Sequence, residues 1–184
     1  MAGDNGSIWL HTDKNNLFNF FPETNKLVEH KKWLSESGYI DSKLIKTINN
    51  NLWFINESGV LTSYIPSKQT FIKYSKKGIP PLVNIQKDEN QLLWLVTIKN
   101  DLLNFSTANK HFTPLNTTIR KDFKKSSINN ISVSEKTVII GSDSHGLILF
   151  DKKSKNISIF NENNKLKNNY IASIAFDSME NAWV

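Results

Sequence analysis

Short runs of apolar residues recur along this chain at a nearly constant interval, and polar turns separate them. One three-residue apolar cluster is centred in turn on Trp9, Trp53, Trp94, Ile139 and Trp183, so that it returns every 41 to 45 residues. A period of roughly 20–50 residues is the sequence signature of a repeat architecture. The hydrophobic pattern therefore predicts an array of similar units.

Each period contains four short apolar or β-branched runs, of the length of strands. Around the second anchor the runs are 44–48, 52–54, 60–64 and 71–74, and most of the other periods keep this order. The connections are rich in Asn, Asp and Gly, as in Asn49-Asn50-Asn51, and these residues tolerate the positive φ of tight hairpins. The runs leave no room for a helix, so they predict four-stranded antiparallel β-meanders.

Four strands in a period of this length are typical of a β-propeller blade, and an irregular β-sandwich is the alternative. We expect an all-β, propeller-like array of about four repeats that forms a single propeller segment over 1–184. The predicted blades are 1–34, 35–76, 77–120, 121–165 and 166–184, of which the first and the last are incomplete. Because propellers close with roughly four to eight blades, we expect a fragment of a larger propeller, with a minimal four-bladed ring as the alternative.

The repeated tryptophans are expected to be core residues, because a blade covers its faces by stacking on its neighbours. Burial of one such ring stabilises the fold by about 3 kcal/mol, and truncation to alanine costs about 3–5 kcal/mol. The alternative is that Trp9, Trp53 and Trp94 form a platform for a ligand.

Composition excludes several classes of function but does not identify one. The chain carries 23 Lys and Arg against 17 Asp and Glu, a net charge of +6, but these lysines are scattered, so nucleic acid is not an expected partner. No cysteine is present, which excludes disulfides and thiolate metal sites. No apolar stretch of about 15 residues occurs, so we expect neither a signal peptide nor direct membrane insertion by this segment.

No catalytic or metal-binding constellation is expected. The histidines lie at His11, His30, His111 and His145. They share no ligand spacing such as His-x-x-x-His. Ser142-Asp143-Ser144-His145 holds the residue types of a catalytic triad, but adjacent hairpin residues point in different directions, so we interpret it as a turn. We expect no metal, no cofactor and no enzymatic activity; the alternative is a propeller enzyme whose residues converge from several blades, some of them absent.

Two groups of residues are candidates for ligand contact. Trp33 and Tyr39 lie outside the repeated core positions, in a long connection, and exposed loop aromatics commonly stack on sugar rings. Arg120, Lys121 and Lys124 belong to a basic loop that could hold an anionic sugar or a partner. The alternatives are that Trp33 packs back over the blade edge and that the basic loop is only solvated.

The repeat resembles the two-component regulator propeller of bacterial hybrid sensor proteins of the Bacteroides type. The closest stretch is 165–184, which is similar to the family's Ile-x-x-Ile strand, Asp-x-x-Gly turn and Leu-Trp-Ile strand. Gly141-Ser142, Gly146-Leu147 and Phe150-Asp151 look like the family's Gly-Thr, Gly-Leu and Tyr-Asp pairs. No single blade matches in full, since His11-Thr12, for example, replaces Gly-Thr.

The resemblance implies a periplasmic sensor region, in which propellers detect a nutrient, commonly an oligosaccharide, and pass the signal through a membrane helix to a histidine kinase. The implied partners are an oligosaccharide, the remaining blades of the parent protein and, in a homodimer, a second copy. The alternative function is a protein-protein interaction scaffold or dimerisation propeller that binds no small molecule.

Overall fold

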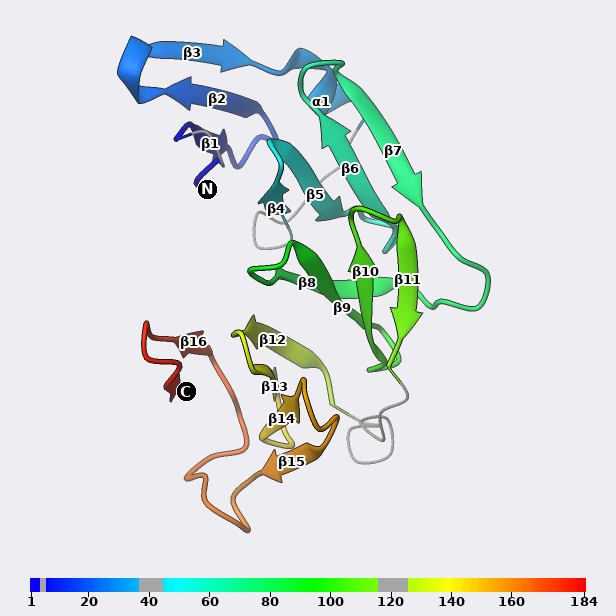
Figure 1. Ribbon diagram of the computed structural model, residues 1–184, viewed down its shortest axis with the longest axis vertical. Coiled ribbons are helices and arrows are strands. Elements are labelled where there is room, and N and C mark those ends of the chain that lie inside the picture. The colour runs from blue at the N-terminus through cyan, green and yellow to red at the C-terminus, as the bar shows by residue number, and fades with distance from the viewer. Residues whose placement is uncertain (4–5, 37–44, 116–125) are drawn as a thin grey trace. The chain divides into compact units, whose positions relative to one another are not determined.

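The described part of the chain is built from short antiparallel strands that follow one another in hairpins (Figure 1). The computed structural model describes residues 1–3, 6–36, 45–115 and 126–184. The chain divides into two compact units, Met1–Pro81 and Leu82–Val184. Each unit is described by itself below.

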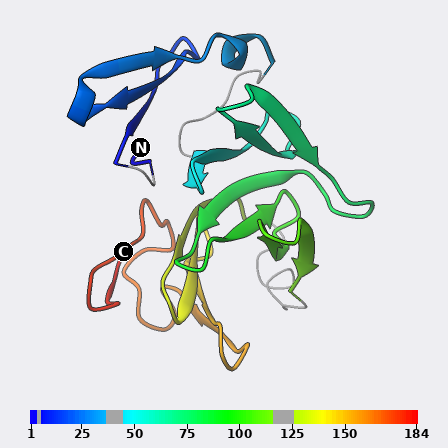
Figure 2. The same cartoon turned by 45° about the horizontal axis from the view of Figure 1, so that its top comes forward.

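The first unit holds a three-stranded and a four-stranded sheet. The three-stranded sheet contains β1 (Ile8–His11), β2 (Leu17–Phe21) and β3 (Lys26–Glu29) in that order (Figure 2). The four-stranded sheet contains β4 (Ile45–Ile48), β5 (Asn51–Ile55), β6 (Leu61–Ile65) and β7 (Thr70–Tyr74). All neighbouring strands are antiparallel, so each sheet is a meander.

The second unit holds two four-stranded meanders and a hairpin. The first meander contains β8 (Leu82–Lys87), β9 (Leu92–Thr97), β10 (Leu102–Ser106) and β11 (His111–Pro114). The second contains β12 (Ile128–Val133), β13 (Thr137–Ser142), β14 (Leu147–Asp151) and β15 (Ile157–Phe160). The hairpin pairs β16 (Ala175–Phe176) with β17 (Ala182–Trp183). The all-β fold of four-stranded antiparallel blades is thus confirmed.

Two details differ from the sequence expectation. A 3-10 turn at Pro22–Thr24 and a short helix, α1 (Lys31–Glu36), occur where no helix was predicted. The helix lies in the connection after β3 and carries Trp33, whose side chain is fully buried. The predicted strand over 171–176 is shorter than expected: Ile171 donates its backbone N–H to Ser142 O instead, and only Ala175–Phe176 pair as a strand.

Asparagine makes the tight hairpins possible. Asn49 and Asn50 have φ of 51° and 57° between β4 and β5, and Asn100 has φ of 61° between β9 and β10. Left-handed conformations of this kind strain most side chains but are tolerated by Asn. Asparagine at these positions therefore suits the short connections between the strands.

Within each unit, a tryptophan at an anchor position packs against the next sheet along the chain. In the first unit Trp9 of β1 packs in a cluster with Leu52 and Phe54 of β5. In the second unit Trp94 of β9 packs in a cluster with Val138 and Ile140 of β13. Trp9 and Trp94 therefore each lie against the residues that flank the anchor of the following sheet in the same unit.

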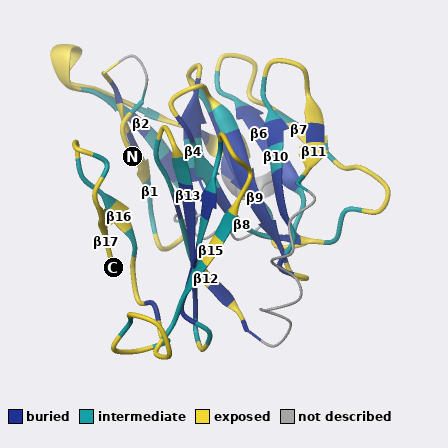
Figure 3. Cartoon of the chain, turned by 60° about the horizontal axis from the view of Figure 1, so that its bottom comes forward, coloured by how far each residue is buried: buried dark blue, intermediate teal, exposed yellow. Residues whose placement is uncertain are grey.

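Four of the five anchors are buried core residues. Trp9, Trp53 and Trp94 are only 2–3% exposed, as is Ile139, whereas Trp183 is 66% exposed. Figure 3 shows buried residues in the strands and exposed residues at many hairpin turns. Core packing of Trp9, Trp53 and Trp94 is what the repeat pattern predicted, whereas the exposed Trp183 departs from that prediction.

Candidate functional site

Trp33, predicted to contact a ligand from an exposed loop, lies in the core of the first unit. Its side chain is 0% exposed, and its ring centroid lies 4.9 Å from that of Phe54 and 5.5 Å from that of Tyr64. A ring without an exposed face cannot stack on a sugar in this conformation. The structure thus has the alternative given for Trp33, in which its ring packs back over the sheet, because an indole on a short helix gains more by packing over the neighbouring aromatic rings than by facing water.

The other candidates for ligand contact lie outside the described residues. These are Tyr39, Arg120, Lys121 and Lys124. Their assignment stays a prediction.

The Ser-Asp-Ser-His stretch forms a local polar network. His145 Nδ1 is hydrogen-bonded to Ser126 Oγ and lies 3.0 Å from Ser144 Oγ, while Ser144 donates to Asp143 Oδ1 at 2.8 Å. In a catalytic triad the carboxylate would orient the imidazole, whereas here it accepts from a serine. The arrangement has the hydrogen bonds of a turn, as expected. Within the part of the chain that the structure describes, no group of three or more acidic or histidine side chains could hold a metal.

A buried ion pair lies beside Trp94 in the second unit. Lys152 Nζ is 3.2 Å from Asp88 Oδ2, donates to Ser134 O at 2.6 Å and sits 5.1 Å from the centroid of the Trp94 ring. Asp88 also accepts from the Trp94 indole N–H at 3.0 Å. These groups satisfy one another, so the network holds the turn and the anchor together and offers no open position to a ligand.

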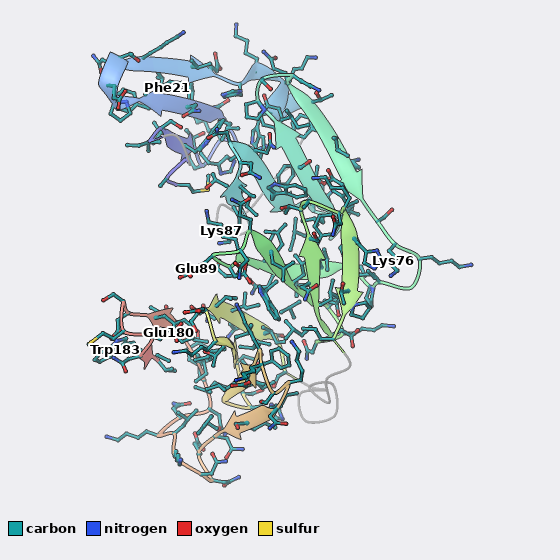
Figure 4. The ribbon with its side chains drawn as sticks, in the orientation of Figure 1. Phe21, Lys76, Lys87, Glu89, Glu180 and Trp183 are labelled. Atoms are coloured by element: carbon teal, nitrogen blue, oxygen red, sulfur yellow. The ribbon has the colours of Figure 1, made fainter. Side chains whose placement is uncertain are left out.

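The hairpin of β16 and β17 repeats this turn without the lysine. Asp177 accepts from the Trp183 indole at 3.1 Å and from the side chain of Asn181 at 3.0 Å. Hydrogen bonds from Asn181, and then from Trp183, lower the pKa of Asp177 to about 2. The carboxylate is therefore charged at neutral pH, and the turn is preformed although Trp183 is exposed (Figure 4).

A cavity of about 350 Å³ opens in the first unit between its two sheets. Trp9, Asn19 and Phe21 line it from the three-stranded sheet. The β4–β5 turn at 49–51 and the β6–β7 turn at 66–67 line the other side. Trp9 and Asn19 are paired across β1 and β2, and Phe21 lies two residues further along β2, so all three side chains share one face of the sheet.

Asn19 is the residue of this cavity with unused hydrogen-bonding capacity. Its side chain is 7% exposed, and Oδ1 has no hydrogen-bond partner among the described residues. A buried acceptor without a donor costs about 1–3 kcal/mol of folding stability. Because Oδ1 has less than 1 Å² of accessible surface, the protein encloses it and a ligand in the cavity does not reach it.

His30 lies behind Trp9, away from the cavity lining. The two ring centroids are 5.0 Å apart, and His30 Nδ1 is 3.0 Å from the hydroxyl of Tyr64. Burial lowers the pKa of His30 below its ordinary value, because a buried imidazolium would lose its hydration. The histidine thus supports the wall of the cavity in its neutral form.

Sequence reasoning missed this site. The available signal was a single polar residue inside the apolar run Leu17–Phe21, on the face that carries Trp9. Asn104 stands opposite Trp94 in the same register and does not line a described cavity. The sequence pattern by itself therefore could not distinguish the two asparagines.

Neither a protein-family model nor a curated protein matches this chain. Several solved structures are similar. The extracellular domain of the one-component system BT4673 from B. thetaiotaomicron matches at a TM-score of 0.68 and 21% identity, over 100% of this chain and 25% of that one. The extracellular domain of the hybrid two-component system BT3049 from the same organism matches at 0.68 and 19%, over 100% and 24%.

A streptogramin B lyase is similar as well, at a TM-score of 0.66 and 14% identity, over 100% of this chain and 59% of the lyase. At these identities the likeness concerns the fold, and it confirms a propeller-type array. The chain spans about a quarter of the length of the two B. thetaiotaomicron domains, which are of the kind that the sequence repeat resembles. In the described residues no helix is long and apolar enough to cross a membrane.

Proposed function

We propose that this chain is part of the ligand-sensing propeller of a bacterial hybrid two-component protein. The observation that carries the proposal is that all of the chain matches extracellular domains of such systems, and its own repeat resembles theirs. On this proposal the segment is periplasmic and noncatalytic, the nutrient is an oligosaccharide, and a kinase lies outside these residues.

The architecture suits this task physically. Blades that stack through buried anchors form a stiff support, and turns at the ends of the strands are free to contact a ligand. A ligand that binds the folded state but not the unfolded chain raises the melting temperature.

The test is thermal unfolding of the chain in the presence of a panel of oligosaccharides. At about 100 times the dissociation constant a ligand adds about 2.7 kcal/mol, which raises the melting temperature by several degrees. We expect a reproducible rise with one class of glycan. A sharp transition that no member of the panel moves would contradict the proposal for this segment.

A second candidate function, association of copies, is favoured by an open apolar face on the first sheet. Ile8 and Leu10 of β1 are 39% and 43% exposed, and Leu27 of β3 is 55% exposed. The register pairs Ile8 with Phe20, and Phe20 with Leu27, so these side chains lie on one face. This is the face opposite to Trp9.

The packing inside the first unit indicates which kind of residue covers such a face. Ile8 and Leu10 flank Trp9 in the way that Leu52 and Phe54 flank Trp53. Leu52 and Phe54 are covered by an anchor tryptophan, Trp9. Trp183 is an anchor whose ring is exposed. We therefore propose, as the second candidate, that Trp183 of one copy packs against Ile8 and Leu10 of the next in a head-to-tail contact.

A further inference from the structure

We propose that strand β7 pairs edge to edge, in antiparallel orientation, with β7 of a second copy of this chain. The strand, Thr70–Tyr74, is the last of its sheet, with β6 on one side, and among the described residues no strand pairs with its other side (Figure 1). Such an edge presents backbone N–H and C=O groups to which a further strand can bond. The proposal is independent of the sensing function and of the head-to-tail contact through Trp183.

The register inside the sheet decides which backbone groups of β7 point outward. The β5–β6 hairpin is closed by a hydrogen bond from the N–H of Asn56 to Val60 O, so Val60 bonds towards β5. The direction of hydrogen bonding alternates along a strand, so the β6 residue opposite Ile72 bonds towards β7, and Ile72 bonds towards β6. Phe71 and Lys73 therefore direct their N–H and C=O groups away from the sheet.

This alternation restricts how two β7 strands can pair. In an antiparallel pair, residues that point outward must face each other. A two-fold axis at Ile72 meets this condition, because it places Phe71 of each copy opposite Lys73 of the other, and each such pair exchanges both of its N–H···O=C bonds. An axis at Lys73 would instead place the two lysines opposite each other.

The side chains of β7 are self-complementary about Ile72. This residue is 41% exposed, and in the paired strands it meets Ile72 of the second copy, so two apolar side chains leave water together. Lys73 meets the aromatic ring of Phe71, a favourable contact for a cation. A lysine on an edge strand ordinarily prevents pairing. Here the register keeps the two ammonium groups from facing each other.

The other outer strands are less suited to pairing with themselves. Strand β11 ends in Pro114, which has no N–H to donate. On β3 the corresponding axis, at Val28, would place the charged Glu29 opposite the apolar Leu27. Strand β15 carries no large apolar side chain that is exposed. Self-pairing is therefore assigned to β7.

The proposed contact is small. Each copy contributes a strand of 5 residues. Stable interfaces use about 20–30 residues a side. The pairing is therefore short-lived for the isolated chain, and a covalent trap detects it better than a measurement of mass.

The experiment uses the absence of cysteine from the chain, because a single introduced cysteine then reports a single contact. The variants are Ile72→Cys and the matched control Thr70→Cys, on the same strand and the same face. Each is oxidised with glutathione disulfide at equal protein concentration, and covalent dimer is followed on non-reducing gels. Cysteines at position 72 lie directly opposite each other, within the reach of a disulfide, whereas position 70 faces position 74. We expect Ile72→Cys to form dimer about tenfold faster than Thr70→Cys.

A second substitution tests whether backbone pairing causes the difference. Lys73→Pro, added to Ile72→Cys, removes one outward N–H and leaves the hydrogen bonds to β6 in place. It should lower the rate to that of Thr70→Cys, while the melting temperature shows that the fold is kept. Equal rates for Ile72→Cys and Thr70→Cys would overturn the proposal, as would a fast rate that survives Lys73→Pro.

A mixed pair of variants replaces Lys73→Pro if that chain does not fold. Positions 70 and 74 face each other only when the axis lies at Ile72, so a mixture of Thr70→Cys and Tyr74→Cys should cross-link faster than either variant alone. A mixture that is no faster would overturn the proposal.

Discussion

At the scale of single residues, the polar side chains of most interest are buried ones with an atom that lacks a hydrogen-bond partner. Asn19 and His30 each have a buried side-chain atom without a hydrogen-bond partner in the described residues, Oδ1 and Nε2 respectively. Asn19 lines a cavity, but its Oδ1 has less than 1 Å² of accessible surface, so the unsatisfied acceptor costs folding stability. His30 is instead enclosed by the rings of Trp9 and Tyr64, so its unpaired nitrogen affects the response of the fold to pH.

His30 is expected to make the fold sensitive to mild acid. Its pKa is lowered in the folded protein, so between about pH 7 and pH 5 the unfolded chain takes up a proton that the folded chain refuses. The free energy of unfolding should then decrease as the pH falls, by at most about 1.4 kcal/mol per pH unit from this group. Chemical denaturation at a series of pH values measures this slope.

The matched variant is His30→Gln, which keeps a polar side chain but cannot titrate. Any packing energy that the substitution removes is lost at every pH, and the comparison at about pH 8 measures this constant part. We expect a flatter dependence below about pH 7 in the variant. An identical slope in both proteins would show that another group carries the acid sensitivity.

At the scale of elements, tight hairpins depend on residues that accept a left-handed backbone. Gly146, between β13 and β14, has φ of +83°, and a Cβ atom there would lie 2.1 Å from the carbonyl oxygen of Phe160. Gly78, before β8, has φ of +89° but open space around the same position. A substitution at Gly146 therefore tests backbone strain and steric clash together, and a substitution at Gly78 tests backbone strain alone.

Gly146→Ala is expected to destabilise the chain by more than about 2 kcal/mol, because strain and a clash with backbone act together. Gly78→Ala should cost about 1 kcal/mol, since the strain acts without the clash. Urea denaturation of the two variants measures the difference. Equal costs would mean that the β13–β14 hairpin can move away from β15 without loss.

At the scale of the whole molecule, the same packing rule operates inside each unit. An anchor tryptophan of one sheet is covered by the flanking residues of the next, as the clusters around Trp9 and Trp94 show. On the second candidate function, the open face of Ile8 and Leu10 on one copy and the exposed ring of Trp183 on another would form one more contact of this kind. Such a contact between copies is head-to-tail and can propagate.

If copies associate in this way, sedimentation should show mass that rises with protein concentration. Leu10→Glu and Trp183→Ser should each abolish the rise, because each removes one side of the contact. Ile98→Glu is the control, since Ile98 is 63% exposed in the β9–β10 turn and belongs to neither β1 nor the β16–β17 hairpin. Association that persists in both variants, or a wild type that stays monomeric, would contradict this second candidate.

Much of the fold could be predicted from the pattern of residues, because it depends on local spacing. Anchors about 44 residues apart and Asn-rich turns between them predict four strands per period, and the described sheets have this form. The candidate site could not be predicted in the same way. Trp33 looked like an exposed loop aromatic, and only its neighbours Phe54, Tyr64 and Phe71 bury it.

The sequence by itself determined the repeat, the strand order within each meander and the core role of the first four anchors, since alternation along a strand decides which side chains share a face. The tertiary structure alone decided which polar residues are buried without a partner. Asn19 and Asn104 occupy the same register beside an anchor tryptophan, yet only Asn19 lines a described cavity. The reason is that a cavity arises where the turns of a neighbouring sheet stop short of filling the space, and that depends on the packing of segments distant in sequence.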